Sequence, residues 1–127
     1  MRNDKTVLVV DDDLHIRRVT ELKLNMAGYN VISAANGQEG KACIEQNHPD
    51  AVITDITMPV MDGKEMCELT NPLKTERPFL TVIITARIES DERRWISEMT
   101  DTIFMEKPFS PSRLLEVVDN YLGVSDG

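Results

Sequence analysis

Runs of apolar residues alternate with longer amphipathic segments along the chain, and the alternation repeats five times. The first, third and fourth runs are continuously apolar, so we expect their strands to be covered on both faces, as in a parallel sheet. The predicted strands are Thr6–Val10, Asn30–Ala34, Ala51–Thr54, Leu80–Thr85 and Ile103–Met105. The pattern therefore predicts an α/β fold of the (βα)5 type, a doubly wound five-stranded parallel sheet with helices on both faces and right-handed crossovers.

The segments between these strands carry helical periodicity. The first predicted helix covers Leu14–Ala27, and the side expected to face the core comprises Ile16, Val19, Met26 and Ala27. The last predicted helix has Ser110 as its N-cap and Pro111 at its first position. Its apolar face comprises Leu114, Val117, Val118, Tyr121 and Leu122, and its polar face comprises Arg113, Glu116, Asp119 and Asn120. The weaker stripe over Asp91–Met99 predicts a marginal helix.

Composition narrows the functional classes. The chain has 127 residues, of which 41% are hydrophobic, and a net charge of −8, which argues against direct nucleic-acid binding and against docking on an anionic membrane. It begins with polar and charged residues and has no apolar stretch long enough to span a membrane, so we expect a cytoplasmic location. We expect one domain over residues 1–123, a short polar tail over 124–127 and no output domain in this chain.

The cysteines and histidines do not predict a metal centre. Cys43 and Cys67 form no CxxC pair, and we interpret both as reduced cysteines partly buried in helices. His15 and His48 lack ligand spacing and are interpreted as surface or loop residues. The sequence therefore excludes a zinc site.

Polar residues follow four of the predicted strands, where the carboxyl ends of a parallel sheet meet. Asp11, Asp12 and Asp13 follow the first strand and Asp55 the third, Thr85 ends the fourth, and Lys107 follows the fifth. Taken singly, such an Asp is usually a helix N-cap, such a Thr a half-buried strand residue, and such a Lys solvated. Their coincidence at one edge instead favours a shared site, because ligands of doubly wound sheets bind there.

The chemistry that these residues favour is transfer of a phosphoryl group to a carboxylate. Asp11 and Asp12 are suited to bind Mg²⁺, which relieves their mutual repulsion. Asp55 beside the metal stays ionised and acts as the nucleophile. Lys107 and the Thr85 hydroxyl compensate charge on the transferred group. Asp13 is one residue too far and is expected to cap the following helix.

Four stretches together resemble the receiver domains of two-component response regulators: "VLVVDDDLHIRR", "DITMPVMDG", "IITA" and "KPFSPSRLLEVV", in that order. The resemblance covers essentially the whole chain and implies a flavodoxin-like fold of strand order 2-1-3-4-5. It implies that Asp55 accepts phosphate from a histidine kinase or phosphotransfer protein. Mg²⁺ would be held by Asp11, Asp12, Asp55 and the backbone carbonyl of Thr57.

The resemblance also implies a switch. Lys107 would pair with the phosphate and precede a cis bond to Pro108, while Thr85 would move to the phosphate and Phe104 would follow inward. The changed surface, made by the fourth helix, fifth strand and fifth helix, would regulate an unknown downstream protein. The chain would be a monomer or a weak, phosphorylation-linked dimer. It would be no conventional enzyme, because it catalyses only its own phosphorylation and autodephosphorylation.

Other residues of these motifs have structural or tuning roles in this interpretation. We expect Pro59 and Gly63 to shape the turn after the third strand. Asp62 is expected to cap a helix with the apolar residues Met66, Leu69 and Leu73. The resemblance implies that Thr57 and Arg87 tune dephosphorylation at the edge of the site. Thr100 and Asp101 stand where receiver domains commonly have Gly-Ala, which predicts an altered loop before the fifth strand.

Two alternatives stay open from the sequence. Asp11-x-Asp13 after a strand is also found in phosphatases of the haloacid dehalogenase type, in which Asp11 would be the nucleophile. No Gly-Thr follows it here, and "DITMPVMDG" would be unexplained. The other alternative is a pseudo-receiver, an interaction module that is never phosphorylated, although such a module would normally have lost one of the site residues.

Overall fold

A computed structural model describes residues 1–86 and 88–124. Within them, five parallel strands form one sheet in the order β2-β1-β3-β4-β5. The strands are β1 (Thr6–Val10), β2 (Asn30–Ala34), β3 (Ala51–Thr54), β4 (Leu80–Thr85) and β5 (Thr102–Glu106). The helices are α1 (Leu14–Ala27), α2 (Gly37–Asn47), α3 (Gly63–Thr70), α4 (Ser90–Glu98) and α5 (Pro111–Leu122), with 3-10 turns η1 (Arg2–Asp4) and η2 (Asn71–Thr75). The predicted fold class and strand order are confirmed.

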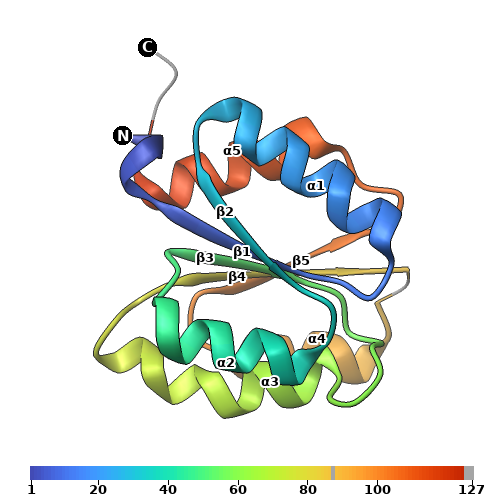
Figure 1. Ribbon diagram of the computed structural model, residues 1–127. Coiled ribbons are helices and arrows are strands. Elements are labelled where there is room, and N and C mark those ends of the chain that lie inside the picture. The colour runs from blue at the N-terminus through green and yellow to red at the C-terminus, as the bar shows by residue number, and fades with distance from the viewer. Residues whose placement is uncertain (87, 125–127) are drawn as a thin grey trace.

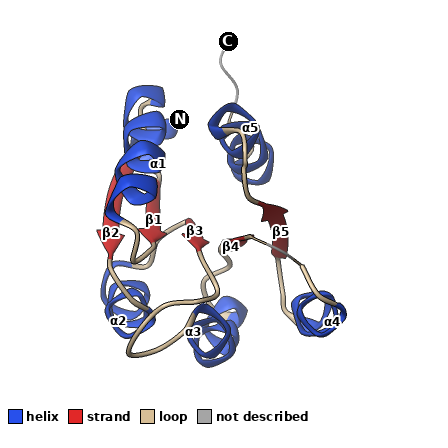
Figure 2. Cartoon of the chain, turned by 90° about the vertical axis from the view of Figure 1, so that its right-hand side faces the viewer, coloured by secondary structure: helices blue, strands red, loops and turns tan. Residues whose placement is uncertain are grey.

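The sheet lies between two helical layers. Figures 1 and 2 show α1 and α5 on one face and α2, α3 and α4 on the other. Every residue of β3 and β4 is buried, because both strands are central and covered on both sides. Each layer has its own core. The upper core, under α1 and α5, contains Leu24 and Leu114, and the lower core, under α2, α3 and α4, contains Met66 and Trp95. No helix in the described ranges is long and apolar enough to cross a membrane.

The predicted core side of α1 was wrong in part. Val19 and Met26 are 40% and 78% exposed, whereas Thr20 and Leu24 are buried. Thr20 can be buried because its hydroxyl donates to the carbonyl of Ile16 at 2.8 Å, so no polar group is left unsatisfied. The helix therefore turns a side towards the sheet that hydrophobicity alone did not indicate.

The predicted polar face of α5 was also wrong at one position. Asp119 is buried, and Tyr121, placed on the apolar face, is exposed. The Asp119 carboxylate accepts hydrogen bonds from Arg2 of η1 at 2.6 and 3.1 Å and from the Tyr29 hydroxyl at 2.5 Å. These partners, together with the charge of Arg2, outweigh burial and lower the pKa of Asp119. A charged residue is buried here because tertiary structure supplies its partners.

The helix after Asp62 is shorter than its apolar residues suggested. α3 ends at Thr70 and the chain continues as η2. Leu69 on α3 and Leu73 on η2 are both exposed rather than packed. Met66 and Cys67 form the buried side instead. Both cysteines are free, Cys67 buried and Cys43 half-buried, as predicted.

The turn between α4 and β5 contains Thr100 and Asp101, the two residues for which the sequence predicted an altered loop. A buried lysine holds this turn. Lys74 of η2 is 5% exposed and donates to the backbone carbonyl of Thr100 and, at 3.1 Å, to the hydroxyl of Thr102. Burial lowers the pKa of Lys74 to about 8. On the outer side, the Tyr121 hydroxyl donates to Asp101 at 2.8 Å. The turn is thus fixed from both sides.

Candidate functional site

The candidate site lies at the carboxyl-end edge of the sheet, between β1 and β3. β1 pairs with β2 on one side and with β3 on the other, so the winding reverses at β1. A crevice forms at such a reversal because the flanking connections leave in opposite directions. Figure 2 looks at this edge, with the strand arrows pointing towards the viewer. The residues that follow β1, β3 and β5 meet here.

Three carboxylates form the acidic part of the site. One oxygen from each of Asp11, Asp12 and Asp55 lies within 4.8 Å of the other two. Asp11 is buried, and its Oδ1 accepts from the backbone N–H of Asp13 at 2.9 Å. Burial raises the pKa of Asp11 despite that hydrogen bond and the nearby ammonium of Lys107. Repulsion within this group favours the binding of a cation.

Asp13 points elsewhere. It is the N-cap of α1, where its Oδ1 accepts from the backbone N–H of Ile16 at 3.1 Å. The predicted separation of the triplet into a pair at the site and a helix cap is therefore what the structure shows.

Lys107 closes the site from the β5 side. Its Nζ lies 2.9 Å from Asp55 Oδ2 and 4.0 Å from Asp11 Oδ2. Burial alone would lower the pKa of Lys107, but the hydrogen bond with Asp55 and the charges of both carboxylates together raise it. The Lys107 N–H donates to the carbonyl of Thr85 at 2.7 Å, and the bond between Lys107 and Pro108 is cis. The ammonium is thus held against the carboxylates.

The loop after β3 fixes Asp55. Its Oδ1 accepts from the N–H of Ile56 at 2.7 Å, and its own N–H donates to Val10 of β1 at 3.2 Å. Gly63 donates to the carbonyl of Ile56 at 2.7 Å, and a Cβ at position 63 would overlap the carbonyl oxygen of Asp55. Only glycine allows this close approach of the two backbone segments, because it has no Cβ, and this explains why position 63 is a glycine.

The turn of this loop is formed by its central residues. The Met61 N–H donates to the carbonyl of Pro59 at 2.8 Å, and Val60 between them has a φ of 70°. A β-branched residue is rare in this region because its Cβ approaches the backbone, so strain is held three residues from α3. Asp62 then caps α3 by accepting from Glu65 N–H at 2.8 Å, as predicted.

The other predicted site residues lie around this centre. Thr57 is exposed on the loop after β3, and Thr85 is the buried last residue of β4. Phe104 pairs with Ile83, two residues before Thr85, so Thr85 and Phe104 lie on the same face of the sheet. Arg87 lies outside the described residues.

Sequence reasoning missed one supporting residue. Arg17 of α1 donates from Nη1 to the backbone carbonyl of Asp11 at 2.8 Å and thereby steadies the end of β1. Arg17 lies one helical turn after Asp13, the N-cap of α1, and residues four apart on a helix lie on the same side. This spacing could have indicated that the arginine reaches back to the end of β1. No sequence signal marked Val60, since valine disfavours a positive φ.

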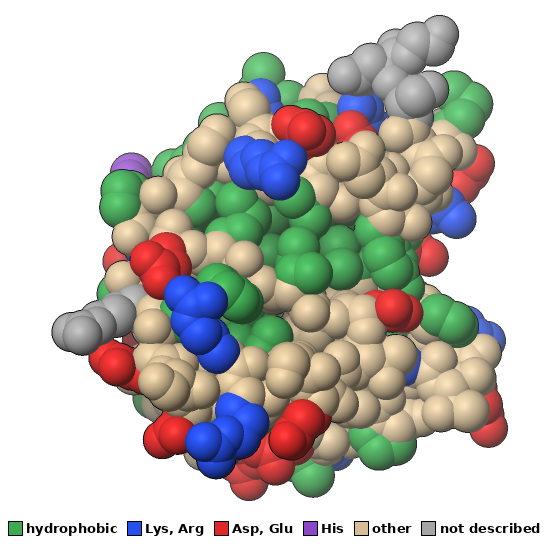
Figure 3. Space-filling model, turned by 180° about the vertical axis from the view of Figure 1, so that it is seen from behind, with side chains coloured by type: hydrophobic (Ala, Val, Ile, Leu, Met, Phe, Trp, Pro, Cys, Tyr) green, Lys and Arg blue, Asp and Glu red, His purple; other side chains and the backbone are tan. Residues whose placement is uncertain are grey.

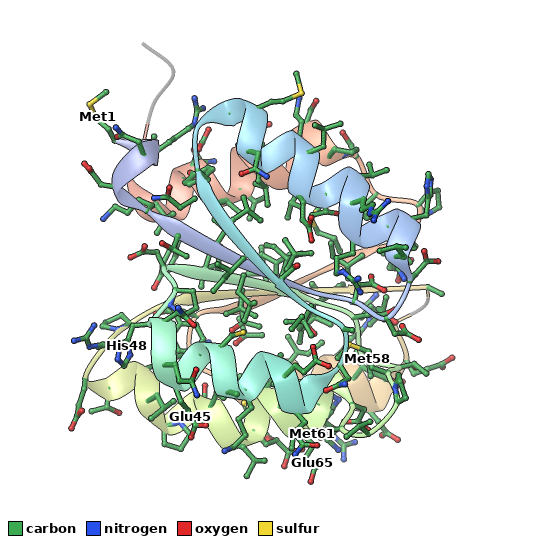
Figure 4. All side chains as sticks on the ribbon, viewed as in Figure 1. Met1, Glu45, His48, Met58, Met61 and Glu65 are labelled. Atoms are coloured by element: carbon green, nitrogen blue, oxygen red, sulfur yellow. The ribbon has the colours of Figure 1, made fainter. Side chains whose placement is uncertain are left out.

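The histidines take no part in this centre. His15 is exposed on the first turn of α1, and His48 ends α2. Figure 4 shows His48 at the left edge of the molecule, well away from Met58 in the loop after β3. Both are surface or loop residues, as predicted.

The donor set fits Mg²⁺. Hard carboxylate oxygens suit this ion, which commonly takes one or two carboxylates and completes its shell with water. Asp11 is buried, Asp12 is exposed and Asp55 is partly exposed, so this group of carboxylates is open to solvent. Burial of Asp11 without a further cation would leave the repulsion only partly compensated by Lys107.

Comparison with known proteins supports the class that fold and site define. The family model of the response regulator receiver domain matches residues 7–119. A receiver domain protein, CheY-like, from Methanospirillum hungatei JF-1 is 30% identical, with a TM-score of 0.86 and 94% of each chain covered. The chain belongs to the response regulator receiver domains, which are modules of two-component signalling.

Curated relatives share the same region. A probable transcriptional regulator ycf27 of Cyanophora paradoxa is 37% identical over 112 residues, 88% of this chain and 46% of the relative. The alkaline phosphatase synthesis transcriptional regulatory protein PhoP of Bacillus subtilis is 34% identical over 108 residues, 85% of this chain and 44% of the relative. The chain thus spans about half the length of the curated relatives it matches.

Proposed function

We propose that this chain is a phosphorylation-dependent switch that accepts a phosphoryl group on Asp55 from a histidine kinase or phosphotransfer protein, with Mg²⁺ as cofactor. The observation that carries the proposal is the contact of Asp55 with Lys107 at 2.9 Å beside two further carboxylates. A carboxylate nucleophile, a fixed ammonium and a cation-binding pair together suit phosphoryl transfer to an aspartate, with the carboxylate as the part that the transfer cannot do without.

In the proposed reaction an oxygen of Asp55 attacks phosphorus, and the bond from phosphorus to the donor imidazole nitrogen breaks. The imidazole leaves with the bonding electron pair. The N–H of Ile56 keeps one carboxylate oxygen in place, and Lys107 neutralises charge on the transferred oxygens. When bound by Asp11, Asp12, Asp55 and the Thr57 carbonyl, Mg²⁺ would supply further neutralisation of the phosphoryl oxygens. Hydrolysis by water then returns Asp55 to a carboxylate and releases phosphate.

The signal would leave the site through Thr85 and Phe104. A phosphoryl group on Asp55 adds acceptor oxygens at the edge of the sheet, and the Thr85 hydroxyl is a donor suited to reach them. Phe104 would follow on the same face and change the surface made by α4, β5 and α5, which we propose regulates a downstream protein. Pro59 and Gly63 have structural roles in this scheme, and Thr57 and Arg87 tune the lifetime.

The phosphodonor is proposed to dock on α1. This helix starts at the site and exposes Val19, Leu22 and Met26 along one side. A Leu22→Glu substitution should slow transfer from a kinase but leave labelling by acetyl phosphate unchanged, because the small donor needs no docking surface. Equal slowing with both donors would argue against docking here.

The burial of the carboxylates bears on the dehalogenase alternative. The Asp11 side chain is 6% exposed and that of Asp55 13%, and one Asp11 oxygen already accepts from Asp13 N–H. The side chain of Asp55 is the more exposed of the two, and its Oδ2 already contacts the ammonium of Lys107, which favours Asp55 as the nucleophile. We further propose that residues 1–123 form the receiver domain, followed by the polar tail, and that the domain is a monomer or a weak phosphorylation-linked dimer.

Radiolabelled acetyl phosphate with Mg²⁺ tests the proposal. We expect a hydroxylamine-labile label on Asp55 that is lost in Asp55→Asn. Lys107→Ala should retain much of the labelling but lose the structural response, since Lys107 neutralises the product rather than supplying the nucleophile. A label on Asp11 would support the dehalogenase reaction instead. No label from acetyl phosphate or from a panel of phosphorylated kinases would support the pseudo-receiver.

A further inference from the structure

The aromatic ring of Phe104 is covered by a cation from α4. Phe104 lies half-buried on β5 and packs against the lower core that contains Trp95 and Ile96. The guanidinium carbon of Arg93 lies 5.1 Å from the centre of the Phe104 ring. This distance is within the range of a cation–π interaction, which is attractive because the face of the ring carries negative charge density.

The two side chains also share a surface groove. A hollow of about 270 Å³ between α4 and β5 is lined by Arg93, Ile96, Ser97, Thr102, Ile103 and Phe104. Figure 3 shows the molecule from behind, where apolar side chains gather between the upper and lower helical layers. The position of the Phe104 ring therefore sets the shape of one wall of this groove, and Arg93 contacts that ring from the helix side.

We propose that Arg93 is a positioning residue that holds Phe104 against α4 and so biases the switch towards its unphosphorylated form. This inference rests on the proposed function, in which Phe104 follows Thr85 inward. Movement of the ring away from α4 separates it from the guanidinium, so the contact exists in one state and not in the other. An interaction made in one state only shifts the equilibrium by its full strength.

The expected size follows from the setting of the contact, an exposed arginine on a half-buried ring. A cation–π contact of this kind changes an equilibrium by about two- to fivefold. The assay is a titration with beryllium trifluoride, a phosphoryl analogue, in the presence of Mg²⁺, and its midpoint is the concentration at which half of the protein responds. Arg93→Ala should lower this midpoint by about two- to fivefold. The response can be followed by fluorescence of Trp95, which is the single tryptophan of the chain and is buried in α4 beside the same core.

Two variants serve as controls. Arg94→Ala removes the same charge from the next position of α4 but leaves the contact with the Phe104 ring. It should therefore have the wild-type midpoint, because the contact and not the net charge biases the switch. Arg93→Lys keeps a cation and should restore most of the wild-type midpoint. Fluorine NMR of protein labelled with 4-fluorophenylalanine gives a second readout: the Phe104 resonance should shift in Arg93→Ala before any analogue is added, and not in Arg94→Ala.

The outcomes are distinct. A wild type that responds, with an Arg93→Ala midpoint equal to or above it, overturns the inference and leaves the proposed function standing. Equal shifts of the midpoint in Arg93→Ala and Arg94→Ala would likewise overturn it, in favour of a charge effect. A wild type that does not respond to the analogue at all overturns the proposed function, and the inference with it.

Discussion

Asp11→Asn tests the electrostatic reasoning about the site, because it removes one of three clustered charges and keeps the shape of the side chain. Asn retains an oxygen that can accept from Asp13 N–H, so the loop after β1 should be preserved. We expect the variant to be more stable than the wild type when divalent cations are chelated. We also expect it to gain less stability when Mg²⁺ is added.

The magnitude follows from the distances. At 4.8 Å, the outer limit for the Asp11 and Asp55 oxygens, two unit charges repel by about 3.5 kcal/mol at an effective dielectric constant of 20. The attraction of Asp11 by Lys107 at 4.0 Å is about 4 kcal/mol by the same measure, so these two interactions nearly cancel. The burial of the Asp11 charge and its repulsion by Asp12 remain, and we expect a net gain of about 1 kcal/mol in Asp11→Asn.

Thermal melts with chelator and with millimolar Mg²⁺ measure this gain. About 1 kcal/mol corresponds to a rise of about 3–5 °C in Tm for a chain of this size. Asp13→Asn is the matched control, because it removes a charge two residues further along the chain and leaves an oxygen to cap α1. It should change neither Tm nor the Mg²⁺ response by a comparable amount. A lower Tm of Asp11→Asn in chelator would refute the reasoning.

Four further predictions concern residues around the site and the core. Arg2→Ala should lower the free energy of unfolding in urea by about 2–3 kcal/mol, because the buried Asp119 carboxylate loses its cation. Folding lowers the pKa of Asp119, so the ionised carboxylate should stabilise the fold fully above its unfolded pKa near 3.8. This stabilisation should be lost as the pH falls through the folded pKa of Asp119. Acid unfolding of Asp119→Asn should lack this loss of stability. Val60→Asn should raise stability in thermal melts by about 1 kcal/mol, because Asn tolerates a positive φ; no gain would mean that the loop is unstrained. Gly63→Ala should lower stability by about 1–3 kcal/mol and slow labelling of Asp55, since the added Cβ meets the Asp55 carbonyl oxygen; normal labelling would argue that the loop relaxes.

The strands and the location of the site could be predicted because they depend on local patterns. A strand that is apolar at every position is expected where both faces of the sheet are covered, and β3 and β4 are indeed buried throughout. Parallel strands bring their carboxyl ends to one edge, so residues after each strand must meet there. This is why Asp11, Asp55 and Lys107, far apart in the chain, could be assigned to one site before any distance was known.

Helix faces were less predictable where a polar residue found a partner. Asp119 was assigned to the solvent side because an isolated carboxylate avoids burial, yet Arg2 and Tyr29 satisfy it from 117 and 90 residues away. Thr20 was overlooked because its hydroxyl bonds within its own helix. Hydrophobicity ranks side chains one at a time, whereas burial depends on the groups that surround them.

The sequence by itself determined the fold class, the places of the strands along the chain and the polar residues that follow them, because hydrophobic period and residue type can be read from the chain. Only the tertiary structure decided how those residues bear on one another: Lys107 at 2.9 Å from Asp55, Lys74 beneath the α4–β5 turn and Arg93 over the ring of Phe104. Each of these contacts joins side chains from different elements. Their strength depends on distance and burial, which exist only once the chain has folded.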